Sequence, residues 1–340
     1  MIIFALYMKK KIAVIGDGGW GTAVALLLAE KGYGVTLWGA FPDYTALLNQ
    51  KRVNEKFLPG VKIPASVRLT SDIGEIADSS LFVIAVPTKY LRKVLSGFRG
   101  KTGKIKAISL TKGIEADTLK RPAEIISEIL DIDRLAVLSG PSISFEVARK
   151  FPTTVVASAD DAGFRQEVQE TFNNASYNFR VYTSGDTVGV ELGGALKNII
   201  AIAAGISDGM GFGANSKAAI LTRGLVEITR LGVKMGAGKE TFFGLSGLGD
   251  LATTCMSSHS RNRWLGEEIG KGRKLKEVLK ETEMIIEGVN TAKSARDLAG
   301  KMKTEMPITE KIYQVLHEDK EPKEALRELM ARALKAEAVG

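Results

Sequence analysis

Lys197 occupies an unusual sequence setting for a charged residue. It lies in the stretch 188–215, whose centre consists of small and apolar residues apart from Lys197 and Asn198. At helical spacing, the lysine shares one face with Gly193 and Gly194. Burial disfavours a charged ammonium and lowers its pKa toward neutrality, where a lysine can exchange protons with a reacting group. The alternative interpretation is a core helix from which the lysine side chain reaches solvent.

Other residues have types and spacing that could act beside such a lysine. Lys112 follows an apolar run and precedes a glycine, and Asp250 is the one carboxylate of a small-residue loop. Ser260, Arg261 and Asn262 precede an expected helix, and hydroxyl, guanidinium and amide groups at a helix start suit an anion. Each has a plainer explanation: an exposed loop lysine, a turn aspartate and a solvated arginine.

A glycine-rich turn early in the chain predicts a dinucleotide site. The order is a strand at 11–15, the turn G-D-G-G-W-G, a helix at 22–31 and a second strand at 34–38. In such a turn, Gly16 permits the tight bend, Gly18 lets a pyrophosphate approach the backbone, and Gly21 lets the helix pack on the strand. Glu287, which follows two isoleucines, could bind a ribose or an amide of the same ligand, or could simply end a helix.

The residues after the second strand bear on the choice of dinucleotide. Sites specific for NAD usually place an acid there to bind the ribose 2′-hydroxyl. Here the chain reads Trp38-Gly39-Ala40-Phe41, and basic residues follow at 51, 52 and 56. Without a carboxylate to repel a 2′-phosphate, the sequence favours NADP as cofactor, or use of both NADP and NAD.

The remaining pattern predicts the fold class and two domains. Continuous apolar runs at 81–86, 105–110 and 135–138 are typical of parallel strands buried on both faces, and runs at 154–157 and 178–182 extend the sheet. From residue 188 the pattern is helical, with helices expected at 214–231, 264–269 and 324–336 and with Pro307 and Pro322 at helix starts. We therefore expect an α/β protein: a Rossmann-type doubly wound sheet over 8–188, followed by an all-α C-terminal domain over 189–340.

Composition narrows the ligands and the compartment. The 340-residue chain carries a net charge of +8 without a long basic block, which favours small anionic ligands over nucleic acid. Two histidines and one cysteine offer no metal-ligand spacing, and a lone Cys255, interpreted as a buried structural thiol, suits a reducing, cytoplasmic setting. The apolar residues 1–7 are too few to span a bilayer, so we expect no membrane insertion and take Met8 as the natural start.

Taken together, the motifs resemble those of bacterial NAD(P)-dependent glycerol-3-phosphate dehydrogenases from about Met8 to the C-terminal helix. The matching segments are G-D-G-G-W-G at Gly16, F-L-P-G at Phe57, S-L-T-K-G-I-E at Ser109, S-G-P-S at Ser139, E-L-G-G-A-L-K-N at Glu191, S-D-G-M-G-F-G-A-N at Ser207, G-L-G-D-L at Gly247, S-R-N-R at Ser260 and E-M-P-I-T-E at Glu305. NAD-linked hydroxyacid dehydrogenases in general share the first of these segments and lack the later set.

The resemblance implies a role for each candidate residue. The dinucleotide site would contain Gly16, Gly18, Gly19, Trp20, Gly21, Ala40, Lys112, Ser144, Arg261, Ile285 and Glu287. The substrate would be held by Lys112, Gly140, Ser142, Lys197, Asp250, Ser260, Arg261 and Asn262. Lys197 would be the proton donor or acceptor. Ala40 and Ser144 depart from the residues that the family often has at these positions, so any 2′-phosphate contact lacks an obvious source.

The implied reaction interconverts dihydroxyacetone phosphate and sn-glycerol 3-phosphate with NAD(P)H, as a step toward glycerophospholipids. Lys112 and Asn198 would polarise the carbonyl and orient the site, and Asp250 would position Lys197 or a substrate hydroxyl. A homodimer is also implied by the family. Two other classes remain open: a dehydrogenase of unphosphorylated 3-hydroxyacids, and a non-catalytic module that senses a dinucleotide.

Overall fold

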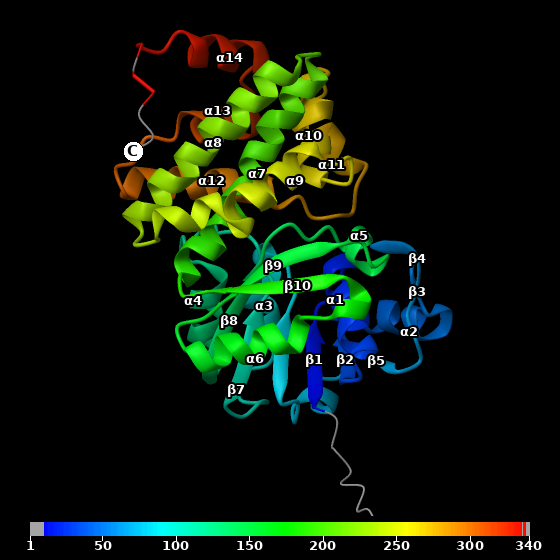
Figure 1. Ribbon diagram of the computed structural model, residues 1–340. Coiled ribbons are helices and arrows are strands. Elements are labelled where there is room, and N and C mark those ends of the chain that lie inside the picture. The colour runs from blue at the N-terminus through cyan, green and yellow to red at the C-terminus, as the bar shows by residue number, and fades with distance from the viewer. Residues whose placement is uncertain (1–9, 335, 338–340) are drawn as a thin grey trace, which may run out of the picture.

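The computed structural model describes residues 10–334, 336 and 337, and it consists of a sheet-containing half below a helical half (Figure 1). The expectations for residues 1–9 lie outside this part of the chain. The long helix α7 (Thr187–Gly209) follows the last strand and opens the helical half. Its first residue, Thr187, lies two positions before the predicted start of the helical domain at residue 189.

Eight strands form the main sheet, in the order β10-β9-β8-β7-β6-β1-β2-β5. Their bounds are β1 (Lys11–Ile15), β2 (Gly34–Trp38), β5 (Val67–Thr70), β6 (Leu81–Ile84), β7 (Ile105–Ser109), β8 (Ile132–Ser139), β9 (Thr153–Ser158) and β10 (Phe179–Ser184). A separate antiparallel pair is formed by β3 (Val53–Asn54) and β4 (Leu58–Lys62). The predicted strands at 11–15 and 34–38 are confirmed, and the other predicted strands are found with ends shifted by up to three residues.

Helices cover both faces of this sheet, as a doubly wound fold requires. They are α1 (Gly19–Glu30), α2 (Pro42–Lys51), α3 (Thr88–Ser96), α4 (Pro122–Ile129), α5 (Ser144–Ala148) and α6 (Ala162–Phe172). Strand side chains alternate between the faces, so Ile12 and Val14 join the core beneath α1 and α6, whereas Ala13 and Ile15 join the core beneath α3 and α4. The apolar runs of the strands thus fill two cores at once.

One strand pair breaks the parallel pattern. Strand β9 pairs antiparallel with β8, through Val137 with Ser158 and Ser139 with Val156, whereas β10 pairs parallel with β9. The chain leaves β8 and turns back through the short α5 at the same end of the sheet, so no full crossover helix separates the two strands. The continuous apolar runs identified these strands but could not give their direction.

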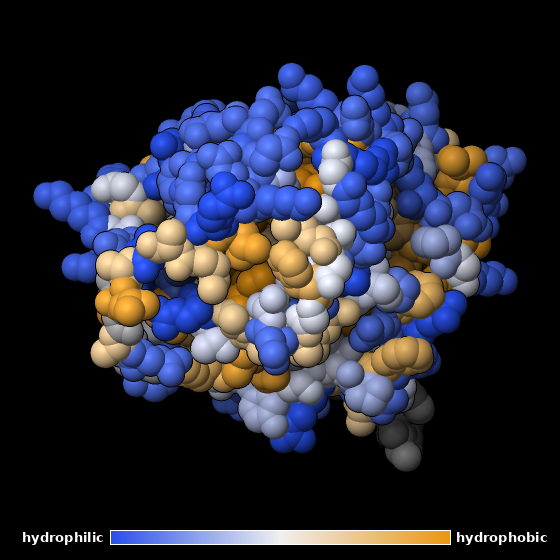
Figure 2. Space-filling model, turned by 90° about the horizontal axis from the view of Figure 1, so that it is seen from above, coloured by the Kyte–Doolittle hydropathy of each residue, from blue (hydrophilic) through white to orange (hydrophobic). Residues whose placement is uncertain are grey.

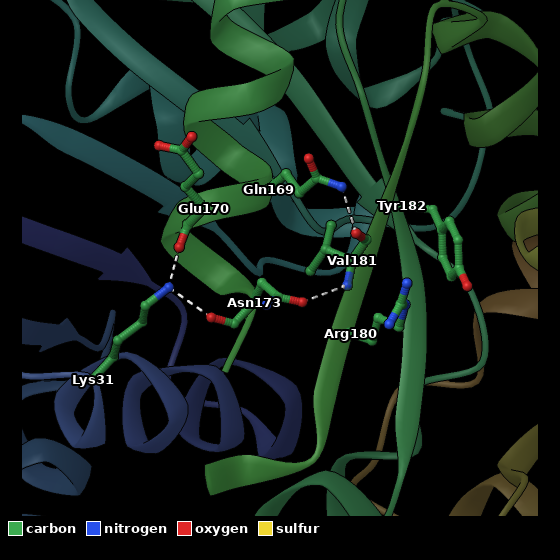
Figure 3. A pocket seen from close by; sticks show the side chains of 7 residues that line it. All are labelled: Lys31, Gln169, Glu170, Asn173, Arg180, Val181 and Tyr182. Atoms are coloured by element: carbon green, nitrogen blue, oxygen red, sulfur yellow. Dashed lines mark hydrogen bonds between the residues drawn. The ribbon is translucent and has the colours of Figure 1, made fainter. Parts of the chain in front are cut away.

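The free edge at β10 has its backbone bound by side chains of α6. Gln169 Nε2 donates to the carbonyl of Val181 at 2.8 Å, and the amide of Val181 donates to Asn173 Oδ1 at 3.3 Å (Figure 3). These side chains and Lys31 line a shallow cavity of about 470 Å³ beside the strand. An exposed edge otherwise presents unpaired backbone groups to other chains.

The opposite edge, at β5, is bound in the same way. Arg52 donates from Nη2 to the carbonyl of Val67 at 2.7 Å, and Asn49 donates to the carbonyl of Leu69 at 3.2 Å. Val67 and Leu69 alternate along the strand, so both carbonyls point away from β2. Both ends of the sheet therefore have outward backbone groups that are occupied by side chains.

The C-terminal half is helical throughout the described residues. Its α-helices are α7, α8 (Ala214–Lys234), α9 (Asp250–Met256), α10 (Arg261–Gly270), α11 (Leu275–Lys280), α12 (Glu287–Lys301), α13 (Pro307–His317) and α14 (Pro322–Met330). Pro307 and Pro322 stand at helix starts, as predicted. The last helix was predicted wrongly at 324–336: it starts two residues earlier and ends at Met330.

Helix α7 forms the core of this half. It is long and apolar enough to cross a membrane, but 94% of its most apolar stretch is buried inside the protein. Helices α8, α9, α10 and α12 pack against it. Seen from the helical side, polar side chains cover most of the surface, and apolar side chains gather in a band among them (Figure 2). The helix is therefore enclosed within the protein, by helices of its own domain and by β8 of the sheet.

Two buried glutamates fix elements of different parts of the chain. Glu191 of α7 accepts hydrogen bonds from Arg121 Nη1 at 2.5 Å and from the amide of Ala123 at 2.8 Å, which ties α7 to the start of α4. Glu227 of α8 accepts from the amides of Ile308 and Thr309 at 2.6 and 3.1 Å, at the start of α13. Helix α13 has no side-chain cap of its own, so Glu227 replaces it.

Candidate active site

Two lysines from different domains bind one buried carboxylate. Lys112, just past β7, donates to Asp250 Oδ2 at 2.7 Å, and Lys197 of α7 donates to Asp250 Oδ1. Asp250 is only 1% exposed and Lys197 only 6%. Lys197 also donates to the hydroxyl of Thr254 at 2.8 Å, one turn after Asp250 on α9. The interpretation of Lys197 as a lysine that reaches solvent is therefore wrong.

Burial makes the Lys197 ammonium a stronger acid than the ammonium of an ordinary lysine. Desolvation lowers the pKa of Lys197 to about 8, although the negative charge of Asp250 acts in the opposite direction. The positive charge of Lys112 lowers this pKa further. A pKa near the working pH lets one group act as both proton donor and proton acceptor.

Small residues in α7 create the space for this cluster. A methyl group at Gly194 would lie 2.6 Å from the Ser139 hydroxyl oxygen and 3.5 Å from Cγ of Lys112. A methyl group at Gly193 would lie 2.5 Å from the carbonyl oxygen of Ser246. Lys112 also donates to the carbonyl of Gly140 at 3.0 Å. The two glycines that share a helix face with Lys197 therefore admit the Lys112 side chain and the loop that precedes Asp250.

Gly140 and Ser142 complete the surroundings of Lys112. Gly140 adopts a φ of +133°, which side chains rarely adopt, and its carbonyl also accepts from the Ser142 hydroxyl at 2.8 Å. Ser142 Oγ lies 3.4 Å from the Lys112 ammonium. Lys112, Gly140, Ser142, Lys197 and Asp250, which are widely separated in sequence, thus form one cluster at the carboxyl ends of β7 and β8.

A second polar cluster begins at Asn198, the residue after Lys197. The Asn262 amide donates to Asn198 Oδ1 at 3.1 Å and accepts from the backbone amide of Gly288 at 2.9 Å. Arg261, the first residue of α10, donates to the carbonyl of Ile285 at 2.8 Å, and its side chain is exposed. The amide pair thus fixes the start of α10 against α7 and α12, with Arg261 at the surface of the site.

Glu287 connects this cluster to the sheet-containing domain. It starts α12 and accepts from the backbone amide of Thr88, at the start of α3, at 3.0 Å. Burial raises the pKa of Glu287 to about 7, against the effect of the Thr88 hydrogen bond and of Arg261. The Thr88 hydroxyl is buried and has no hydrogen-bond partner among the described residues, so a polar group is left unsatisfied beside Glu287.

The glycine-rich turn has the geometry expected of a dinucleotide site. Gly16 adopts a φ of +111°, and a methyl group there would lie 2.7 Å from the carbonyl of Ala85. A methyl group at Gly21 would overlap the carbonyl of Gly16. At Gly18, by contrast, an added Cβ would meet nothing within 4 Å, and no side chain caps α1 there. The fold therefore explains Gly16 and Gly21, while Gly18 leaves open space beside the free amides of a helix start.

The remaining predicted cofactor residues lie around this turn. A methyl group at Gly19 would lie 3.2 Å from Ser144 Oγ, so these two residues are neighbours. Trp20 follows in α1 with a buried indole N–H that has no partner among the described residues, and Ala40 is exposed just past β2.

The hydroxyl of Ser260 is 3.2 Å from the amide of Arg263 and caps α10. Ser260 therefore has a structural role at the start of α10, and its substrate contact stays a prediction.

Three residues of the site escaped the sequence analysis. Thr254 follows Asp250 by four residues, which is one helical turn, and that spacing could have identified it. Thr88 lies at the end of an apolar run, where ligands bind in such sheets. Asp17 lies within the glycine-rich turn itself.

In the described part of the chain, no three His, Cys, Asp or Glu side chains gather as metal ligands. The cavity beside β10 (Figure 3) contains none of the predicted site residues.

Comparison with known proteins assigns the family. The sequence profile of the NAD-dependent glycerol-3-phosphate dehydrogenase N-terminus matches residues 11–165, and that of the C-terminus matches residues 186–327. Glycerol-3-phosphate dehydrogenase [NAD(P)+] of Citrifermentans bemidjiense is 50% identical over 98% of this chain and 100% of its own length. The corresponding protein of Geobacillus kaustophilus is 49% identical over 96% of both chains.

Solved structures agree with this assignment. The glycerol-3-phosphate dehydrogenase of Coxiella burnetii superposes with a TM-score of 0.91 at 37% identity, over 95% of this chain and 99% of its own. The enzyme of Plasmodium falciparum superposes with a TM-score of 0.84 at 27% identity, over 96% of this chain and 97% of its own. On the evidence of both halves, the chain belongs to the NAD-dependent glycerol-3-phosphate dehydrogenase family.

Proposed function

We propose that this enzyme interconverts dihydroxyacetone phosphate and sn-glycerol 3-phosphate with NAD(P)H. The observation that carries the proposal is the buried arrangement in which Asp250 binds both Lys112 and Lys197. It provides a proton donor of lowered pKa beside a second fixed cation, which suits the reduction of a carbonyl to an alcohol. Bound nicotinamide supplies or accepts the hydride in this chemistry.

Each residue of the cluster has a defined part in the reaction. Lys197 gives its proton to the alkoxide oxygen during reduction and takes a proton from the hydroxyl during oxidation. Asp250 holds the Lys197 ammonium through Oδ1 and the Lys112 ammonium through Oδ2. Lys112 polarises the carbonyl, and Asn198, oriented by Asn262, helps to orient the substrate. Positive charge is thus present before the alkoxide forms.

The substrate phosphate is assigned to the start of α10. Arg261 is exposed there, and the amides of a helix start add partial positive charge. A guanidinium can bind a phosphate through paired hydrogen bonds. Ser260 and Asn262 flank Arg261 in the sequence, and Gly140 and Ser142, which contact Lys112, are also assigned to the substrate. This anion site favours a phosphate ester over an unphosphorylated 3-hydroxyacid.

The dinucleotide is assigned to the glycine-rich turn and to the second polar cluster. Open space at Gly18 and the free amides at the start of α1 fit a pyrophosphate. Gly19, Trp20, Ala40 and Ser144 are assigned to the same part of the dinucleotide site, and Arg261, Ile285 and Glu287 with Lys112 are assigned to the nicotinamide end. The absence of an acid from Trp38 to Phe41 supports use of NADPH. Asp17, a carboxylate outside that segment, acts against this preference.

A direct assay distinguishes the proposal from its alternatives. Purified enzyme is mixed with NADPH or NADH, and the loss of absorbance is followed with dihydroxyacetone phosphate, unphosphorylated dihydroxyacetone or a 3-oxoacid. We expect turnover with dihydroxyacetone phosphate and little with the other two. Turnover with the oxoacid alone would identify a hydroxyacid dehydrogenase, and dinucleotide binding without turnover would identify a sensing module.

We also infer the metabolic setting and the assembly of the enzyme. Its product, sn-glycerol 3-phosphate, is the backbone on which glycerophospholipids are built, so a role in their synthesis follows from the proposed reaction. The free, buried Cys255 suits a reducing compartment such as the cytoplasm. A homodimer is proposed from the resemblance to the family. Sedimentation at enzyme concentrations from nanomolar to micromolar would test that assembly.

A further inference from the structure

Asp17 carries an unpaired carboxyl oxygen inside the dinucleotide half of the protein. It is the second residue of the glycine-rich turn, between β1 and α1. Its Oδ2 atom is buried and has no hydrogen-bond partner within the described part of the chain. Burial raises the pKa of Asp17 to about 6, so the carboxylate is mostly charged at neutral pH. A buried carboxyl oxygen that accepts no hydrogen bond costs stability, which favours a role toward a ligand.

The carboxylate lies directly against the end of β2. A methyl group at Gly39 would clash with Asp17 Oδ2 and would lie 2.8 Å from the hydroxyl of Thr45 on α2. The Thr45 hydroxyl is likewise buried without a partner. Only glycine at position 39 therefore leaves room for the Asp17 side chain at this place.

A buried hydrogen-bond network holds Asp17 in position. Asn54 donates to the Asp17 carbonyl at 2.8 Å and to the Thr22 hydroxyl at 2.7 Å. Tyr44 donates in turn to Asn54 Oδ1 at 2.7 Å. These contacts, made by Asn54 of β3 and Tyr44 of α2, hold the backbone of the glycine-rich turn in place. They therefore also fix the position from which the Asp17 side chain extends.

The end of β2 is the place where Rossmann folds read the ribose of the dinucleotide. An acid there binds the 2′-hydroxyl of NAD and repels the 2′-phosphate of NADP. In this chain Gly39, Ala40 and Phe41 include no acid, but the turn before α1 places the Asp17 carboxylate beside Gly39. The acid thus comes from a different segment of the chain, but it lies beside the end of β2, where Rossmann folds usually have one.

The basic residues that follow β2 do not neutralise the negative charge of the Asp17 carboxylate. Arg52 donates to the carbonyl of Val67 at the sheet edge, and Lys56 pairs with Glu283. Lys51 stands in the last turn of α2, ~9 Å along the helix from Thr45, the residue of α2 that lies beside Gly39. None of these three cations is placed to balance a 2′-phosphate beside Asp17.

We propose that Asp17 determines the balance between NADH and NADPH, because its carboxylate disfavours a 2′-phosphate at the end of β2. The inference rests on the proposed function only in that the enzyme binds a dinucleotide. Removal of the charge should favour NADPH over NADH by about tenfold or more, since like charges in poorly solvated surroundings interact by at least the energy of one decade in affinity.

The test measures dissociation constants of NADPH and NADH by fluorescence titration of the full chain without substrate. Asp17→Asn should raise the preference for NADPH, expressed as Kd(NADH)/Kd(NADPH), by about tenfold or more. The matched control is Asp43→Asn, which removes an exposed charge from the first turn of α2 and should change the ratio less than twofold. Asp17→Ala, which removes the buried polar atoms altogether, provides a second variant if the asparagine impairs folding.

The outcomes separate this inference from the proposed reaction. An unchanged ratio in a folded Asp17 variant overturns the role of Asp17, and so does an equal shift in the Asp43 control. If an Asp17 variant shifts the ratio but the wild-type enzyme fails to reduce dihydroxyacetone phosphate, the role of Asp17 is supported. Only the proposed reaction is then overturned. If the enzyme is active, the ratio of kcat/KM with NADPH to kcat/KM with NADH should change in parallel with the ratio Kd(NADH)/Kd(NADPH).

Discussion

Lys112 and Lys197 approach the same carboxylate from opposite domains. One follows the strand β7, the other lies in the helix α7, and each binds its own oxygen of Asp250. The cluster exists only when the sheet and the helical half are packed together. The three side chains are separated by 85 and 53 positions along the chain, so only the tertiary fold can place them in contact.

Replacement of Lys197 by alanine tests its role in proton transfer. We expect kcat to fall by ~10²–10⁴, the usual contribution of a general acid or base, with dinucleotide binding retained. Lys217→Ala, which removes a lysine that pairs with Asp208 on the same side of α7, is the matched control. A kcat within a few-fold of wild type in Lys197→Ala would exclude the assigned role. Partial recovery with added methylamine would support it.

The pH dependence should have opposite signs in the two directions. Reduction needs the ammonium form of Lys197, so kcat/KM for dihydroxyacetone phosphate should fall as the pH rises through about 8. Oxidation needs the free amine, so kcat/KM for sn-glycerol 3-phosphate should rise over the same range. Because the charge of Asp250 raises this pKa, Asp250→Asn should move both profiles to lower pH. Profiles that stay in place would show that another group titrates.

Arg261 should discriminate phosphorylated from unphosphorylated substrate. A charged hydrogen bond contributes ~1.5–3 kcal/mol, so Arg261→Ala should lower kcat/KM for dihydroxyacetone phosphate at least ~10–100-fold. Dihydroxyacetone, which lacks the phosphate, should be used about equally by both proteins at saturating NADPH. The deciding quantity is the ratio of the two kcat/KM values. If the ratio does not change, the phosphate is bound elsewhere, and Lys112 would be examined first.

Glu227 should contribute to stability without contributing to catalysis. Glu227→Ala leaves the buried amides of Ile308 and Thr309 without partners, at a cost of ~2–5 kcal/mol in the free energy of unfolding. Glu324→Ala, which removes an exposed glutamate from the first turn of α14, should cost no more than ~0.5 kcal/mol. Urea denaturation of both variants measures the difference. Equal stabilities would show that Glu227 is not needed as the cap of α13.

The sequence predicted much of the fold because its signals are local. The turn from Gly16 to Gly21, the apolar strands and the helix around Lys197 each depend on spacing within one segment. The sequence could not reveal that β9 runs antiparallel to β8, since an apolar run has no direction. It also could not show that Asp17 lies against Gly39, because that contact depends on how the ends of β1 and β2 meet. The pairing of Asn198 with Asn262 is long-range for the same reason.

The side chains bound along β10 and β5 restrict how two copies of this enzyme can associate. To continue the sheet from one subunit into the next, a partner strand would have to displace Gln169 and Asn173 at one border, or Arg52 and Asn49 at the other. The incoming strand would form backbone hydrogen bonds in place of those that the displaced side chains now make. The number of hydrogen bonds would change little, so the exchange would gain little free energy. Subunit contacts are therefore expected on helical surfaces, which leaves each nucleotide-binding sheet a closed unit of its own chain.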